Sequence, residues 1–407
     1  MKKGILFLII MSLLTGCTKE PLFNDKSDIK IAVATDLHYF AKEYYEQCEW
    51  FEDEMLIGDG KMVTYADEII DAFIEDVISK DVDMVLLTGD LSFNGEMNSH
   101  KELANKLKKL EDNGIVVAVT AGNHDIDNIF SKGYGKDDYL EAENISGEDF
   151  KEIYKDYGYD IAVSEHKESL SYELILNNQY SLMVIDTNTH EMTTGSALDT
   201  GGKITDSTKE WLTNRLKKCQ EEERIPLIAM HHNLGVHSAV LNSGYTIKDN
   251  EDFVDLFKNY NVPLVLSGHL HIQSILDVDG IKEIATSSLM VNPLQYGLLE
   301  ITDDNIQYHA QSLKISKDSG EYFDEVGNNK FFSGETDETS LLKKEAMVLL
   351  NKHYFAGTVS LVKDEIMKMP GYSLIVNDDG NEFYKEYFID MINHDGNNTE
   401  LKIEITH

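Results

Sequence analysis

The sequence has few cysteines and few basic residues, and each shortage excludes a class of protein. Its 407 residues include three cysteines, too few for the disulfide framework of small secreted domains. Lysine and arginine total 36 against 73 aspartates and glutamates, a formal net charge of -37. Such a chain repels a nucleic-acid backbone, so we expect no stable nucleic-acid binding. With 42% hydrophobic residues it is expected to fold, as one large domain with a smaller attachment.

Long apolar runs are also missing beyond the N-terminus. Lys2 and Lys3 precede an apolar stretch over residues 5–14, which is typical of an export signal and too short to span a bilayer comfortably. The stretch ends in Leu14-Thr15-Gly16-Cys17, which resembles the lipobox of bacterial lipoproteins. The resemblance implies that residues 1–17 form a lipoprotein signal with an acylated Cys17. The protein is then anchored at the extracytoplasmic face of a bacterial cell membrane. An ordinary signal peptide with an incidental cysteine is the alternative.

The segment after Cys17 and the two remaining cysteines also allow predictions. Residues 18–28 are polar and rich in turn-forming residues, which predicts a short tether. Cys48 and Cys219 are expected to be free thiols, and a disulfide between them is the alternative in an oxidising compartment.

The chain from residue 29 alternates short β-branched runs with amphipathic stretches of helical period, a pattern typical of an α/β domain. Covering helices are predicted over 65–79, 100–110 and 207–222. Beyond about residue 314 this alternation stops. Helical segments are predicted there over 340–352, 358–367 and 382–392, followed by a strand over 401–406.

Six predicted strands each end at polar residues that can bind metals. The strands span 29–35, 84–88, 115–120, 181–185, 226–230 and 263–267. They run into Asp36, Gly89-Asp90, Gly122-Asn123-His124-Asp125, Asp186, His231-His232 and Gly268-His269-Leu270-His271. Open α/β sheets bind their ligands beyond the carboxyl ends of the strands, so these residues are predicted to converge on one crevice.

The ordered motifs resemble those of the calcineurin-like metallophosphoesterases. The resemblance rests on Asp36-x-His38, Gly89-Asp90, Gly122-Asn123-His124-Asp125, His231-His232 and Gly268-His269-x-His271. It implies a four-layer α/β/β/α sandwich over 29–313. Residues 314–407 are then a small, mostly helical C-terminal cap or accessory domain, with no chemistry of its own that the sequence reveals.

Phosphoester chemistry explains the residue types in these motifs. Hydrolysis at neutral pH needs a nucleophilic hydroxide and relief of charge on the phosphoryl oxygens, which two cations roughly 3.5 to 4 Å apart provide. The resemblance assigns Asp36, His38 and His271 to the first metal, Asn123, His231 and His269 to the second, and Asp90 to both. It also implies attack by a hydroxide that bridges the metals. Imidazole and carboxylate ligands suit two divalent transition-metal ions, with Mn, Fe or Zn left open.

Other residues of the motifs are expected to act without binding metal. The resemblance assigns His124 to transition-state stabilisation and protonation of the leaving group, with Asp125 orienting it. His232 is left open between substrate contact and packing. Asp186, Thr187 and Asn188 either shape the crevice or form a plain loop, and the plain loop is favoured.

The residue at position 93 indicates which branch of the family this chain resembles. Purple acid phosphatases have a metal-binding tyrosine three residues after the bridging aspartate, where this chain has Phe93. The chain thus resembles the divalent-metal branch that includes bacterial cyclic-nucleotide phosphodiesterases. We expect hydrolysis of small phosphodiesters such as cyclic nucleotides. The alternatives are a phosphomonoesterase, an envelope phosphodiester hydrolase, and a non-catalytic metal-binding or solute-binding lipoprotein. The oligomeric state is left open.

Overall fold

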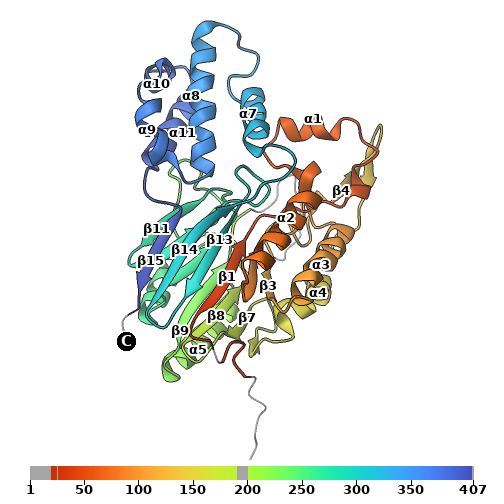
Figure 1. Cartoon of the computed structure of the whole chain (residues 1–407), viewed down its shortest axis with the longest axis vertical. Helices are drawn as coiled ribbons and strands as arrows, with labels where there is room; N and C mark the ends of the chain where they lie inside the picture. Colours follow the sequence, from red (N-terminus) through yellow and green to blue (C-terminus); the bar gives the residue numbers. More distant parts are fainter. Residues whose placement is uncertain (1–19, 25, 190–199, 406–407) are drawn as a thin grey trace, which may run out of the picture.

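The structure is a computed structural model that describes residues 20–24, 26–189 and 200–405 (Figure 1). The predicted signal and its Cys17 lie outside the described residues. Within the described ranges, no helix has the length and apolar character needed to cross a bilayer.

The first of two large sheets carries the N-terminal half of the motifs. Its six strands, in spatial order, are β15 (Glu400–Glu404), β14 (Asn305–Ser312), β13 (Gln295–Ile301), β1 (Ile29–Ala34), β2 (Met84–Thr88) and β3 (Val116–Thr120). β1, β2 and β3 are parallel, with Ile31 opposite Met84, whereas β13 is antiparallel to β1. The carboxyl ends of three motif-bearing strands therefore lie side by side at the same end of this sheet.

The second sheet carries the C-terminal half of the motifs. Its seven strands, in spatial order, are β11 (Ser274–Val278), β12 (Ile281–Ala285), β10 (Leu264–Ser267), β9 (Ile225–Met230), β8 (Tyr180–Ile185), β7 (Tyr172–Ile175) and β6 (Ser164–Glu165). β8, β9 and β10 are parallel. The hydroxyl of Tyr172 donates to the carbonyl of Val119 at 2.8 Å, which ties the second sheet to the first.

Helices cover the outer faces of the two sheets. α2 (Ala66–Ser79) and α3 (Met97–Glu111) pack on the first sheet, where the ring of Phe73 lies 5.2 Å from that of Tyr296. α5 (Asp206–Glu221) and α6 (Asn250–Asn259) pack on the second. The result is an α/β/β/α sandwich, so the predicted fold is confirmed.

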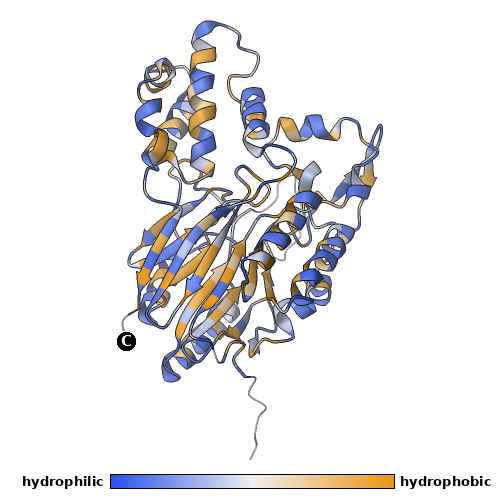
Figure 2. Ribbon diagram, in the orientation of Figure 1, coloured by the Kyte–Doolittle hydropathy of each residue, from blue (hydrophilic) through white to orange (hydrophobic). Residues whose placement is uncertain are grey.

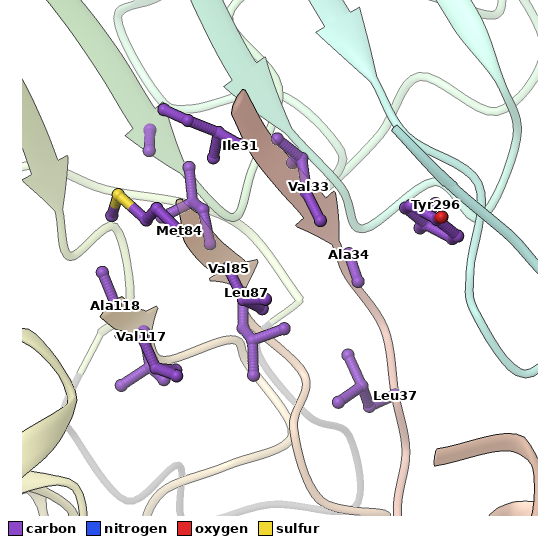
Figure 3. Close-up of a cluster of buried hydrophobic side chains, with 14 of the residues drawn as sticks. Ile31, Val33, Ala34, Leu37, Met84, Val85, Leu87, Val117, Ala118 and Tyr296 are labelled. Carbon is purple, nitrogen blue, oxygen red and sulfur yellow. The ribbon is translucent and has the colours of Figure 1, made fainter. Parts of the chain in front are cut away.

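The parallel strands β1, β2 and β3 are apolar on both faces because each face is covered there. Figure 2 shows hydrophobic residues concentrated in the strands, whereas helices such as α2 and α3 also carry polar residues. Figure 3 shows part of this core, with Ile31, Val33, Val85 and Leu87 among buried side chains of β1 and β2. A continuously buried parallel strand reads as an unbroken apolar run, which explains why the sequence located these strands well.

Smaller elements complete the domain. They are the helices α1 (Phe51–Leu56) and α4 (Gly147–Ile153) and the hairpin of β4 (Lys132–Tyr134) and β5 (Tyr139–Glu141). Cys48 lies among the aromatic side chains around α1, and both Cys48 and Cys219 are buried free thiols.

The C-terminal helices form a second body with its own core. They are α7 (Ser319–Lys330), α8 (Glu338–Phe355), α9 (Val359–Ile366), α10 (Pro370–Val376) and α11 (Glu382–Asn393). α7 and α10 were not predicted from the sequence. The helices stand above the motif-bearing end of the sheets in Figure 1. The apolar faces of α8 to α11 share a separate cluster, whereas Tyr322 and Val326 of α7 belong to the core of the sandwich.

Two predicted boundaries differ from the structure. The expected separate unit over 314–407 is wrong at its end, because β15 pairs with β14 and forms the edge of the first sheet. An edge strand gains stability by covering unpaired backbone groups, which local sequence does not reveal. The expected tether over 18–28 is partly docked, since the backbone N–H groups of Leu22 and Phe23 donate to the carbonyls of Ile175 and Leu176.

Candidate functional site

The polar residues after six strands meet at one end of the sandwich. β1, β2 and β3 lead into Asp36, Asp90 and Asn123, and β8, β9 and β10 lead into Asp186, His231 and His269. The two groups come from different sheets, yet the sheets pack face to face, so their carboxyl ends converge as the sequence predicts.

The first group that can hold a metal ion consists of Asp36, His38, Asp90 and His271. One ligand atom from each lies within 4.8 Å of all the others. The Nε2 atoms of His38 and His271 are 3.1 Å apart, and Oδ1 of Asp36 is 3.2 Å from Nε2 of His271. All four side chains are buried or nearly so.

The second group shares Asp90 with the first. It joins Asp90 to His231 and His269, again within 4.8 Å. Oδ1 of Asn123 lies 3.1 Å from Nε2 of His231, which in turn is 3.4 Å from Oδ1 of Asp90. One carboxylate between two ligand groups is the arrangement that a pair of metal ions requires.

The backbone is unusual at these positions. Five of the candidate ligands adopt the left-handed region, with φ of 51° at Asp36, 38° at His38, 50° at Asp90, 67° at His269 and 63° at His271. Aspartate and histidine enter this region more readily than most residues, but each such residue still costs free energy that the surrounding fold must offset. Strain at so many ligands indicates that the fold is shaped around the site.

Two glycines allow the motif loops to come close together. A Cβ atom on Gly122 would lie 2.2 Å from the backbone nitrogen of Asp90. A Cβ atom on Gly268 would lie 1.9 Å from Oγ1 of Thr35. Neither space can hold a side chain, so both positions require glycine for close approach of the backbone.

Hydrogen bonds outside the cluster decide which histidine nitrogen faces inward. Nδ1 of His231 donates to the carbonyl of Thr88 at 2.9 Å, which leaves its Nε2 for the cluster. Nε2 of His269 donates to the carbonyl of Gly244 at 3.0 Å, which leaves its Nδ1. Such backbone partners fix the tautomer and orientation of a metal-binding imidazole.

The donor atoms fit divalent metal ions. Oδ2 of Asp36 accepts hydrogen bonds from Oγ1 of Thr35 and from the backbone N–H of His269, whereas its buried Oδ1 accepts none and faces Nε2 of His271, itself a candidate ligand, at 3.2 Å. An orphaned, buried carboxylate oxygen is costly unless a cation compensates it. Asp36, His38, Asp90, Asn123, His231, His269 and His271 therefore offer a donor set of carboxylate, amide and imidazole groups that suits Mn, Fe or Zn.

The protonation states also suit metal binding. Burial would raise the pKa of Asp90, but the nearby imidazoles of His231 and His124 lower it well below its usual value, so the carboxyl is ionised. Burial lowers the pKa of His38 far below its usual value and that of His269 to about 4, so both rings are neutral. Burial also disfavours a charge on His231, yet Asp90 raises its pKa to about 9. A bound cation would replace that proton as the partner of Asp90.

His124 points at the cluster without belonging to either metal group. Its Nδ1 lies 2.8 Å from the carbonyl of Phe93 and 3.1 Å from Oδ1 of Asn94, so this nitrogen carries the proton. Its Nε2 is 3.9 Å from Oδ2 of Asp90. His124 also lines the cavity beside the cluster.

Asp125 does not have the role expected from the sequence. Its carboxylate accepts hydrogen bonds from the backbone N–H groups of Leu91, Ser92 and Gly122 and from the hydroxyl of Ser92. The partners of His124 are Phe93 and Asn94 instead. The expectation that Asp125 orients His124 is therefore wrong. Asp125 joins the loops after β2 and β3, because a buried carboxylate takes the nearest unpaired N–H groups.

His232 and the loop after β8 form hydrogen bonds with the segments that surround the cluster. Nδ1 of His232 lies 2.7 Å from the hydroxyl of Thr187, and Nε2 lies 3.0 Å from the carbonyl of Thr200. Asn188 donates to the carbonyl of Ala121 at 2.8 Å, and the backbone N–H of Asn188 donates to Asp186. Of the two readings of His232, these contacts favour packing over contact with substrate.

The site includes residues that the sequence did not single out. Oδ2 of Asp59 lies 3.8 Å from Nδ1 of His271, and the same carboxylate is 3.1 Å from Nζ of Lys61. Both residues border a cavity of about 390 Å³ that extends from the cluster to the C-terminal helices. They lie on the irregular segment between α1 and α2, where no motif or periodicity marks them.

Comparisons with known proteins agree with this geometry. The family profile described as calcineurin-like phosphoesterase matches residues 29–273. A probable cyclic nucleotide phosphodiesterase of Psychrobacter arcticus is 25% identical over 221 residues, covering 54% of this chain and 68% of that protein. A second, from Coxiella burnetii, is 25% identical over 245 residues, covering 60% and 76%.

Solved structures of similar architecture are more distant. A dimetal phosphatase from Danio rerio is 12% identical with a TM-score of 0.49, covering 70% of this chain and 96% of that chain. A purple acid phosphatase from yellow lupin is 14% identical with a TM-score of 0.47, covering 78% and 57%.

Proposed function

This chain belongs to the calcineurin-like phosphoesterase family, and from that premise we propose that it is a two-metal phosphodiesterase acting on small phosphodiesters such as cyclic nucleotides. The observation that carries the proposal is Asp90, which takes part in both groups of candidate metal ligands. A site that served only one ion would have no use for a buried carboxylate between two sets of histidines.

Each residue of the site then has a distinct task. Asp36, His38 and His271 would hold one ion, Asn123, His231 and His269 would hold the other, and Asp90 would contribute to both. When bound, such a pair would supply a nucleophilic water at neutral pH and relief of charge on the phosphoryl oxygens. His124 is placed to deliver a proton to the leaving oxygen, because its Nε2 faces the cluster while Nδ1 is held by Phe93.

The surroundings of the site favour a diester over a monoester. A diester carries one negative charge and two organic groups, whereas a monoester carries nearly two charges. Apart from histidine, only two cationic side chains line the cavity among the described residues, Lys61 and Lys330, while aromatic side chains are plentiful. The names of the two curated relatives point the same way. A phosphomonoesterase is the second candidate.

A lipid anchor on Cys17 is part of the proposal, and it bears on the substrate. Leu22 and Phe23 dock on β7, at the end of the sandwich opposite the C-terminal helices (Figure 1). Few residues separate Cys17 from this contact, and each extended residue spans at most about 3.6 Å. The anchor would then hold the cavity away from the bilayer. This placement favours soluble extracellular diesters over lipid headgroups.

The test of the activity is a substrate panel. Purified protein loaded with Mn is assayed against cyclic nucleotides, linear dinucleotides, glycerophosphodiesters and a nitrophenyl diester and monoester. We expect the cyclic nucleotides and the nitrophenyl diester to be hydrolysed fastest. Preference for the monoester would favour the second candidate. No turnover of any ester by fully metal-loaded protein would favour a non-catalytic metal-binding lipoprotein.

The test of the anchor is separate. Cells grown with a labelled fatty acid should label the wild-type protein and fail to label Cys17→Ser. Equal labelling of both would contradict the anchor without affecting the proposed activity.

A further inference from the structure

The cavity beside the metal cluster has two chemically different ends. One end is lined by Asp90, Asn123, His124, His269 and His271. The other end is formed by the C-terminal helices, which contribute no candidate metal ligand. Its volume of about 390 Å³ is near the lower end of the ~300–1,000 Å³ typical of small-molecule sites. The cavity therefore has room for one small ligand.

The end formed by the helices is aromatic. Its aromatic side chains from the C-terminal region are Phe323, Phe331, Phe355, Phe383, Tyr384 and Tyr387. Most are partly or fully buried, and their packing also stabilises the helices. Burial alone therefore does not distinguish a binding surface from a core.

Phe383 is different because it is exposed. Its side chain is 55% exposed, although it lines the cavity. Its ring is nearly parallel to that of Tyr387, with an angle of 12° and ring centres 6.0 Å apart. A large apolar ring left open beside a metal site offers a face on which a planar ligand can stack.

Two lysines also line the cavity. Lys61 is 3.1 Å from Asp59, whose carboxylate approaches the imidazole of His271. Lys330 ends α7 and also lines the cavity. In a chain with a net charge of -37, two lysines facing one cavity next to a candidate phosphate site are suited to a singly charged anion.

We propose that the C-terminal helices bind the organic part of the substrate. A heteroaromatic ring of the nucleobase type packs on Phe383 and its neighbours, while Lys61 and Lys330 offset the charge of the phosphate. The helices thereby select one nucleotide-sized diester bearing an aromatic ring. This inference rests on the proposed function, since it places the scissile phosphate at the metal cluster.

The kinetic test compares a substrate that has a base with one that lacks it. Wild-type protein, Phe383→Ala and Ile389→Ala are assayed with cyclic AMP and with the cyclic phosphate of methyl riboside. Ile389 is the matched control, because it is an exposed apolar residue of the same helix, 38% exposed, and does not line the cavity.

Phe383→Ala should raise the KM for cyclic AMP about tenfold, since stacking of one base on an aromatic side chain commonly has this effect. The KM for the abasic substrate, and both KM values of Ile389→Ala, should stay within about twofold of wild type. An equal change in KM for both substrates, or no change for cyclic AMP, would overturn the proposal.

A binding experiment separates this inference from the proposed activity. Saturation-transfer NMR with metal-free protein, which cannot hydrolyse the ligand, and cyclic AMP should show transfer to the base protons, and Phe383→Ala should reduce that transfer strongly at equal ligand concentration. If these signals behave as expected but no diester is hydrolysed, the proposed activity is wrong and the aromatic site stands. If diesters are hydrolysed and the base protons receive no saturation, the aromatic site is wrong and the activity stands.

Discussion

The two-sheet domain and the C-terminal helices border the same cavity but differ in the side chains and the backbone geometry that they place there. The sheet edge gathers buried charges, five ligands with left-handed backbone and glycines that tolerate no side chain. The helices present apolar and aromatic faces on backbone of ordinary helical geometry.

This difference predicts how strongly substitutions in each region should affect function. Metal coordination depends on atoms placed to within a few tenths of an ångström, so a single substitution among the ligands removes the function. Stacking on an aromatic wall depends on area and tolerates adjustment, so substitutions there should have graded effects. The following predictions test that contrast, from the largest expected effect to the smallest.

Asp90→Asn should have the largest effect. One amide oxygen cannot replace a carboxylate shared by two cations, so both metals and activity should be lost, with turnover falling on the order of 10³-fold or more. Elemental analysis and rates on a nitrophenyl diester measure the two losses. Retention of two metals per chain would contradict the assignment of Asp90 to both groups.

His124→Asn should separate proton transfer from metal binding. Both metals should remain, because His124 belongs to neither ligand group, while turnover of an unactivated diester falls by ~10²- to 10⁴-fold. With a nitrophenyl leaving group the loss should shrink, since that oxygen needs less protonation. If the variant loses its metals as Asp90→Asn does, His124 is a ligand and not a proton donor.

Glu96→Gln should change the pH dependence of stability. Burial raises the pKa of Glu96 to about 8, from 4.5 for an ordinary glutamate. The folded state therefore holds an extra proton between these values, and the free energy of unfolding falls as pH rises through this window. Removing the carboxyl should reduce that fall by on the order of 5 kcal/mol.

Chemical denaturation at several pH values measures this effect. Glu338→Gln on the exposed start of α8 is the control for the loss of a solvent-exposed carboxyl. Profiles of Glu96→Gln and wild type that coincide would show that Glu96 is ionised in the folded protein.

Asp59→Asn should weaken the first metal. Its carboxylate is 3.8 Å from Nδ1 of His271, beyond a normal hydrogen bond, so its charge orients and polarises the imidazole only moderately. We expect about tenfold weaker metal binding, the lower end of the ~10–100-fold typical of such partners. Metal titration measures it, with Asp279→Asn, a surface partner of Lys258, as the control.

Asn381→Ala should have the smallest effect. The side chain of Asn381 caps α11 by accepting from the N–H of Tyr384, and loss of such a cap typically costs about 1 kcal/mol. Hydrogen exchange should increase in α11 while metal content stays constant. Glu386→Ala, an exposed change within the same helix, is the control. Loss of metal in Asn381→Ala would mean that the two regions are coupled and not separable.

The sequence alone determined the strands of the sandwich and the residues at their ends. Apolar runs located β1, β2 and β3 because these strands are buried on both faces. Motifs such as Asp36-x-His38 and His269-x-His271 resemble those of the calcineurin-like family, and that resemblance identified the candidate ligands. These features are local, so a linear pattern records them.

Only the tertiary structure decided which other residues border the cavity and which partners the buried polar groups have. Asp59 and Lys61 reach the cluster from an irregular segment, and Phe383 reaches the cavity from a helix that shows no motif. The bonds of Asp125 and the return of β15 to the first sheet likewise depend on partners far away in the chain. Contacts of this kind arise when separate elements pack, and no spacing along the chain encodes which surfaces will meet.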